Sequence, residues 1–181
     1  MGVLATIVEL GSNDTVYGFV LLLHILSAIV GFGAVQFNGL YAQQARQRPG
    51  REGVAILQAN WSVSKVAEIF IYLTFLFGVL LVLLSENYLI GFGDLWVSLS
   101  MLLYIVGIGL SHAILFPSVR KANALAEELS GSEGPPPGAQ GPPPQVAQLE
   151  VLGKKIATTD MVLKLMLVAI LFLMIWKPGY P

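Results

Sequence analysis

The sequence predicts an all-α fold, a four-helix transmembrane bundle with both termini on the outer side of the membrane. Three observations predict it. The chain of 181 residues is 55% hydrophobic and only 12% charged, which is too apolar for a soluble domain. It contains four apolar segments long enough to cross the hydrocarbon layer, for which about 20 helical residues are needed. Its basic residues are concentrated in two of the connecting loops. We therefore expect one membrane domain over 1–181, embedded in the lipid bilayer.

The predicted membrane helices cover residues 16–40, 66–84, 95–116 and 156–176. Each segment is longer than a typical strand, and lipid cannot satisfy an open sheet edge, so only helices fit. The fourth helix carries Asp160 and Lys164 in its first turns, one helical turn apart, where they can form an ion pair. The short outer loop 85–94 joins two antiparallel hairpins, which should close into a bundle.

Basic residues predict the orientation of the helices. They fall in the loop after the first helix and in the loop after the third, at Arg46, Arg48, Arg51, Lys65, Arg120, Lys121, Lys154 and Lys155. Cytoplasmic loops are enriched in Lys and Arg, so both loops should be cytoplasmic and both termini outside. Aromatic residues at the predicted outer ends, such as Trp96 and Trp176, agree with this topology. We expect a multi-pass protein of a prokaryotic plasma membrane.

The loop after the third helix has two parts. Pro117 opens a polar stretch that should be helical through Leu129. Residues 130–146 then contain two triple-proline runs among Gly and Ser, a composition that cannot bury a core. We expect this segment to be a disordered cytoplasmic linker.

Several function classes find no support. The absence of cysteine removes disulfides, thiolate metal sites and cysteine nucleophiles. Signatures of hydrolases, phosphate loops and dinucleotide-binding turns are also missing, so the sequence favours a protein that is not an enzyme. The net charge of −1 gives no indication of a nucleic-acid partner.

His24 is the main indication of an activity, because an ionisable residue inside a membrane helix is a candidate functional residue by default. It shares one helical stripe with Ser27, Gly31 and Asn38. In one interpretation the small residues allow close helix packing and His24 hydrogen-bonds to a neighbouring helix. In the other, His24 binds a haem b iron or a copper ion, and the small residues make room for the macrocycle.

A haem ligated by both histidines is not expected. His112 lies near the cytoplasmic end of the third helix, and the rise per residue separates it from His24 by roughly 15 Å along the membrane normal. Met101 lies closer to the depth of His24 and is the candidate second ligand. Its alternative interpretation is an ordinary core methionine.

A second candidate site is a layer of polar residues near the cytoplasmic ends of the helices. Such a layer could shuttle protons or bind a cation. Alternatively, Glu68 and Asp160 could neutralise Lys65 and Lys164 and hold the bundle ends together. The layer consists of Gln36, Asn38, Glu68, His112, Asp160 and Lys164.

Short motifs in the same order and spacing make the chain similar to an uncharacterised family of predicted integral membrane proteins, designated domain of unknown function 2269. They are Leu23-His24 running into Gly31 and Gly33, Phe92-Gly93-Asp94-Leu95-Trp96, Phe116-Pro117 with Arg120-Lys121, Asp160-Met161-Val162-Leu163, and Lys177-Pro178. That family resembles CopD-type copper-resistance proteins and HemJ-type protoporphyrinogen oxidases. The latter resemblance implies haem binding by a first-helix histidine, which His24 matches, and a later lysine, which the predicted third helix lacks.

Three functions remain open. The first is a haem- or metal-binding redox or cofactor-handling module that uses His24. The second is a cofactor-free scaffold or accessory subunit, as a homo-oligomer or within a larger membrane complex. The third is a small transporter that uses Glu68, His112 and Asp160 as a proton or cation path.

Overall fold

The computed structural model describes residues 2–48, 50–85, 90–131 and 144–179, with side chains from residue 15 onward. Within these ranges every regular element is helical, which confirms the predicted all-α class. The elements are α1 (Gly2–Gln36), α2 (Asn38–Gln47), α3 (Arg51–Leu83), α4 (Leu95–Leu110), the π-helix η2 (Ser111–Leu115), α5 (Phe116–Gly131) and α6 (Pro144–Trp176).

Four stretches of helix are long and apolar enough to cross a membrane, as the sequence predicts. They are Thr15–Gln47, Arg51–Leu83, Leu95–Gly131 and Pro144–Trp176. A stretch of 33 residues, such as α3, is about 50 Å long and exceeds the roughly 30 Å of hydrocarbon. The predicted spans are therefore the apolar parts of longer helices, and the first crosses from α1 into α2 at Phe37.

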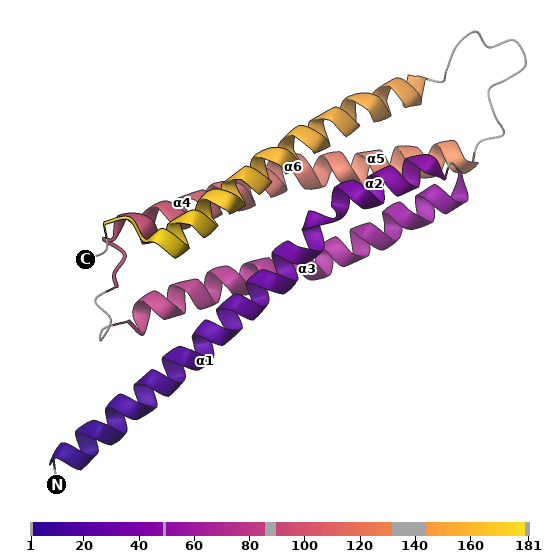
Figure 1. The fold of residues 1–181 in the computed structure, drawn as a ribbon. Helices are drawn as coiled ribbons and strands as arrows, with labels where there is room; N and C mark the ends of the chain where they lie inside the picture. The colour runs from indigo at the N-terminus through magenta and orange to yellow at the C-terminus, as the bar shows by residue number, and fades with distance from the viewer. Residues whose placement is uncertain (1, 49, 86–89, 132–143, 180–181) are drawn as a thin grey trace, which may run out of the picture.

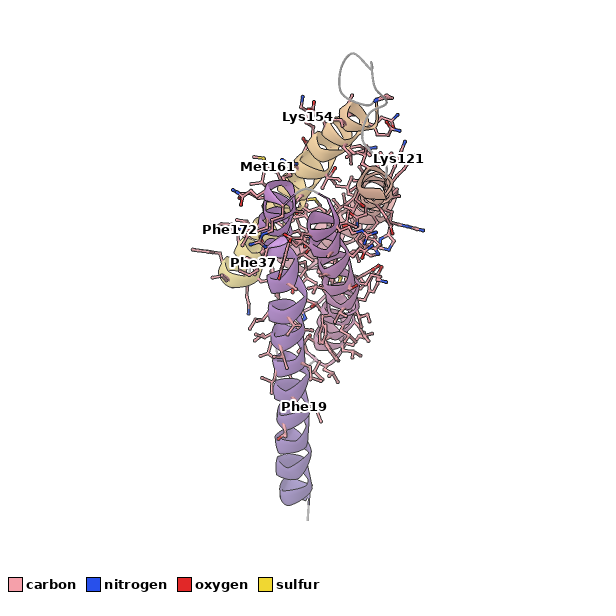
Figure 2. All side chains as sticks on the ribbon, turned by 90° about the vertical axis from the view of Figure 1, so that its right-hand side faces the viewer. Phe19, Phe37, Lys121, Lys154, Met161 and Phe172 are labelled. Carbon is pink, nitrogen blue, oxygen red and sulfur yellow. The ribbon has the colours of Figure 1, made fainter. Side chains whose placement is uncertain are left out.

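The surface of these spans is apolar because lipid replaces water around them. Figure 2 labels four large apolar side chains on it, Phe19, Phe37, Met161 and Phe172, each of which is at least 50% exposed. Buried side chains are instead small or polar at several positions, including Ser27, Thr74 and Ser100. Membrane helices associate through small residues and hydrogen bonds, so this distribution is the one expected in a bilayer.

The helices pack as two pairs. Helix α1 crosses α3, and α4 runs beside α6, while contact between the pairs is made chiefly by α3 and α5 (Figure 1). Gly31 allows the closest approach within the first pair, because a Cβ atom there would lie 2.9 Å from the backbone nitrogen of Ile71. The small-residue stripe predicted on the first helix thus faces α3.

Both basic loops lie at the same end of the molecule, which we name the basic end. The α2–α3 turn, the end of α5 and the start of α6 lie there, and the ends of α3 and α6 and the start of α4 lie at the other end (Figure 1). Figure 2 shows Lys121 and Lys154 at this basic end. The α2–α3 turn is tight: Gly50 adopts a φ of 78°, and a Cβ on Gly53 would lie 2.6 Å from the carbonyl oxygen of Ala45.

The connection from α5 to α6 is described only in part. Helix α5 covers the polar stretch after Pro117, as predicted, and ends at Gly131. Helix α6 begins at Pro144, so both edges of the predicted linker 130–146 are helical. The prediction of disorder falls mainly on residues 132–143, which lie outside the described residues.

Candidate functional site

His24 joins α1 to α3. Its Nδ1 atom lies 2.9 Å from the carbonyl oxygen of Thr74. A carbonyl only accepts hydrogen bonds, so Nδ1 carries the proton and Nε2 of the neutral ring is left as an acceptor. Nε2 forms no hydrogen bond with another described residue.

Gly78 makes room for this ring on α3. A Cβ atom at Gly78 would lie 3.2 Å from Cε1 of His24, so a larger residue would push the imidazole away. Ser27, on the same stripe, donates its hydroxyl to the carbonyls of Leu23 (2.7 Å) and His24 (3.0 Å) of its own helix. The helix bridge in this region therefore depends on His24.

Met101 lies elsewhere, on α4. It packs against an apolar cluster formed by Trp96, Val97 and Leu173 between α4 and α6. No hydrogen bond or ring contact among the described residues joins it to His24. The structure thus gives His24 an open nitrogen and places Met101 in a packing environment.

The two histidines contact different levels of α3. His24 bonds to Thr74 and His112 contacts Glu68, six residues earlier, which is about 9 Å along the helix axis. This separation is smaller than the roughly 15 Å derived from helix rise alone, because each side chain reaches along the helix. It still places the two rings at separate sites.

The six residues of the predicted polar layer line one cavity. The cavity has a volume of about 120 Å³ and lies between the two helix pairs, with walls from all four membrane stretches. Its polar members lie toward the basic end, and its opposite wall is apolar, with Leu103, Tyr104 and Ile170 among the residues that line it. Such a volume holds several water molecules. We call it the interhelix pocket.

Three side chains at one edge of the interhelix pocket form a mutual hydrogen-bond cluster. The Tyr72 hydroxyl lies 2.7 Å from Oε1 of Glu68 and 2.8 Å from Nε2 of His112. Nε2 of His112 also lies 3.1 Å from the same Oε1. On the other side of the ring, Nδ1 of His112 lies 3.0 Å from the carbonyl oxygen of Ile108. We call these three residues the Glu68–Tyr72–His112 cluster.

The protons of this cluster can be counted. Nδ1 of His112 must donate to the Ile108 carbonyl, so a neutral ring has a bare Nε2. If Glu68 is ionised, the hydroxyl of Tyr72 supplies the only proton among its own oxygen, Oε1 of Glu68 and Nε2 of His112. Oε1 and Nε2 then face each other at 3.1 Å as two hydrogen-bond acceptors. One further proton, on either atom, turns this repulsion into a charge-assisted hydrogen bond. The heavy-atom distances therefore fit one proton held between Oε1 of Glu68 and Nε2 of His112.

A second group of polar residues lies at another edge of the pocket. Nζ of Lys164 lies 2.8 Å from Oδ2 of Asp160, the pair that the one-turn spacing predicts. The same ammonium donates to the carbonyl oxygen of Gln36 at 3.4 Å, near the break between α1 and α2. Asn38 accepts a hydrogen bond from Ser64 at 3.3 Å. These contacts connect α1, α2, α3 and α6 around the pocket.

The sequence did not indicate some residues of this site. Tyr72 appeared only as one more aromatic residue of an apolar helix, although its spacing of four from Glu68 is a usable signal. The π-helix at Ser111–Leu115, which carries His112, has no local sequence signature here, and such segments often occur at functional sites. Tyr104 was also missed: its hydroxyl donates to the Ile71 carbonyl at 2.6 Å and ties α4 to α3.

The structural interpretation of the charged residues holds in part, because Asp160 pairs with Lys164 but Glu68 does not pair with Lys65. Glu68 pairs with His112 and Tyr72, and Lys65 forms no ion pair with it among the described residues. Within the same part of the chain, no group of three or more His, Asp and Glu residues is arranged to hold a metal ion.

Comparison with known proteins gives one match. No curated protein and no solved structure matches the chain, so the wider likeness to CopD-type and HemJ-type proteins stays a prediction. The model of one family, described as predicted integral membrane protein, matches residues 19–178. That range includes His24, the interhelix pocket and every residue of the Glu68–Tyr72–His112 cluster. The chain therefore belongs to the family of integral membrane proteins designated domain of unknown function 2269.

Proposed function

We propose that the protein is a small proton-handling membrane module whose working site is the Glu68–Tyr72–His112 cluster in the interhelix pocket. One observation carries the proposal. Three groups that can exchange protons contact one another at 2.7, 2.8 and 3.1 Å, and their hydrogen bonds are complete only with one shared proton.

The pocket around the cluster is suited to proton exchange. Charged groups inside a membrane are costly and mark ion or proton pathways when they face a cavity. The pocket has room for water next to the cluster, and water can carry a proton to and from the carboxylate. Because the polar side of the pocket faces the basic end, we propose that the cytoplasm is one of the two sides between which the cluster passes protons.

Proton flux into proteoliposomes tests the proposal. A vesicle-trapped pH indicator should report flux above that of empty vesicles for the wild type, and Glu68→Gln should reduce it to the empty-vesicle level, since an amide cannot take up the proton. Glu52→Gln is the matched control, because Glu52 is an exposed acid in the first turn of α3, outside the pocket. Wild-type flux equal to that of empty vesicles would contradict the proposal and favour a cofactor-free scaffold.

A second candidate function, haem or metal binding through His24, has its own supporting observation. Ligating histidines usually donate their other ring N–H to a carbonyl or carboxylate, which fixes the ring, and the His24–Thr74 hydrogen bond has this arrangement. The residues present fit one axial ligand, His24; Met101, the candidate second ligand, packs in the apolar cluster of Trp96, Val97 and Leu173. A haem bound at His24 would supply one-electron transfer.

An absorption spectrum tests this second candidate. Protein purified in mild detergent with added haem should show a Soret band that shifts on dithionite reduction and is lost in His24→Ala. The matched control is His112→Ala, which removes the chain's other histidine and should leave the band unchanged. A colourless wild-type preparation would rule the haem function out.

A further inference from the structure

We propose that the interhelix pocket binds a small monovalent organic cation with an apolar surface, such as tetramethylammonium, in exchange for the shared proton of the Glu68–Tyr72–His112 cluster. This inference rests on the proposed proton function and names the ligand that the same site would accept. It follows from the charges, the walls and the size of the pocket.

The charges of the pocket balance only while the proton is bound. Three carboxylate or ammonium groups line it: Asp160 and Lys164 pair at 2.8 Å, which leaves Glu68. Glu68 is balanced by the proton that it shares with His112 at 3.1 Å. When the proton leaves, the pocket carries one uncompensated negative charge at the edge of the hydrocarbon, where such a charge is costly. A monovalent cation restores neutrality.

The walls indicate that this cation is organic. Apolar side chains from all four membrane stretches line the pocket, among them Phe32, Leu103, Leu163 and Ile170. Contact with these apolar side chains would not stabilise a hydrated inorganic ion, whereas it stabilises a ligand with an apolar surface. A bare metal ion is also disfavoured, because the described residues contain no cluster of three metal-ligating side chains.

Aromatic rings add an attraction that is specific for cations. Phe32 and Tyr104 form an edge-to-face pair with centroids 5.9 Å apart, and both line the pocket, as do Tyr72 and Phe116. A quaternary ammonium near aromatic faces gains cation–π energy, which a neutral molecule of the same shape does not. The ligand should also be small, since the cavity measures about 120 Å³.

The exchange is balanced in charge. The cation enters, one proton leaves the cluster to water, and the pocket stays neutral before and after. The charged and titratable groups that face the site are Glu68 and Tyr72 from α3, Tyr104 from α4, His112 from η2, and Asp160 and Lys164 from α6.

Titration calorimetry on the full chain in detergent, with tetramethylammonium as the probe, tests the inference. Repeating the titration in buffers of different ionisation enthalpy gives the number of protons released per cation, which should be one. By linkage, the affinity should then rise about tenfold per pH unit while the cluster is protonated. Tert-butanol, a neutral molecule of nearly the same size, should bind at least tenfold more weakly.

Two variants test whether binding requires the carboxylate of Glu68. Glu68→Gln should abolish binding, while Glu52→Gln should leave it unchanged. If Glu68→Gln does not fold, His112→Gln replaces it: the carboxylate remains, so the cation should still bind, but the pH range over which a proton is released should move.

The inference would be overturned if titration of the wild type released no more heat than titration of empty micelles. It would also be overturned if the cation bound without the release of a proton. If wild-type proton flux depends on Glu68 but tetramethylammonium does not bind, the ligand is wrong and the proton function stands. If there is no flux and no proton release, both are wrong.

Discussion

At the scale of single residues, the contrast between the two histidines separates packing from proton chemistry. His24 has one strong partner, the Thr74 carbonyl at 2.9 Å, and a ring held against Gly78. Its environment fixes one tautomer. His112 instead has a carbonyl on one nitrogen and two proton-exchanging groups on the other. The two histidines therefore have different roles. His24 bridges two helices and keeps one ring nitrogen open for a ligand, whereas His112 belongs to the proton-sharing cluster.

At the scale of elements, α3 takes part in both histidine sites, because it carries Thr74 and Gly78 beside His24 of α1 and Glu68 and Tyr72 beside His112 of η2. Close packing of α1 on α3 sets the position of the His24 site. The crossing depends on Gly31, where an added Cβ would meet the backbone of Ile71 at 2.9 Å and of Phe70 at 3.1 Å. Backbone atoms cannot rotate away as a flexible side chain can. A methyl group there must therefore push the helices apart.

A pair of alanine substitutions on α1 tests this packing. Gly31→Ala should lower the free energy of unfolding by about 1–3 kcal/mol, as overpacking usually does. Gly33→Ala, two residues away, has nothing within 4 Å of its added Cβ and should be neutral or raise stability by up to about 1 kcal/mol, since alanine favours helix. Unfolding in mixed micelles, followed by circular dichroism, measures both. Equal effects at the two positions would show that the crossing is not as close as described.

The π-helix is the second element that matters to the site. A π-helical turn closes between residues five apart, as the hydrogen bond from the Phe116 nitrogen to the Ser111 carbonyl shows. This widened turn holds His112 where it reaches Tyr72 and Glu68 on α3. Edge-to-face contact with Phe116, at 5.1 Å between ring centroids, supports the ring from its own helix.

At the scale of the whole molecule, the distribution of basic residues predicts the orientation of the protein in the membrane. Both basic loops lie at one end (Figure 1), and the polar side of the interhelix pocket faces that end. The positive-inside rule assigns it to the cytoplasm. We therefore propose that both termini lie on the outer side of a prokaryotic plasma membrane and that the cluster exchanges protons with the cytoplasm.

Reporter fusions test this orientation. Alkaline phosphatase fused after Pro181 should be active in cells, because it folds only outside the cytoplasm. The same enzyme placed after Gly131, between α5 and α6, should be inactive. Fluorescence from a cytoplasm-only reporter at the C-terminus would reverse the orientation and place the cluster on the outer side.

How much the sequence predicts also depends on scale. The four spans followed from apolar length, and the layer of six polar residues followed from depth along each helix, since 1.5 Å of rise per residue brings their levels together. Those residues do line one cavity. The Asp160–Lys164 pair followed from its one-turn spacing. The partner of Glu68 was not predictable: depth puts Glu68 near both Lys65 and His112, and the rotation of α3 against η2 decides for His112.

Helix ends were also beyond prediction. Apolar length marks only the part of a helix that lies in lipid, whereas α3 starts at Arg51 and α6 at Pro144, in polar sequence that hydropathy cannot distinguish from loop. The break at Phe37 between α1 and α2 involves no proline and had no signal. Tyr72 was missed because an aromatic side chain in an apolar helix usually serves packing alone.

The central claim, that Glu68 and His112 share one proton, is tested most directly by nitrogen-15 NMR of histidine-labelled protein in bilayers over a pH series. Two histidines are present, so each contributes a separate set of ring signals, and His24→Ala assigns them. We predict that Glu68→Gln changes the pH at which the His112 signals respond and leaves those of His24 unaltered, while Glu52→Gln changes neither. His112 signals with the same pH response in the wild type and in Glu68→Gln would contradict the claim.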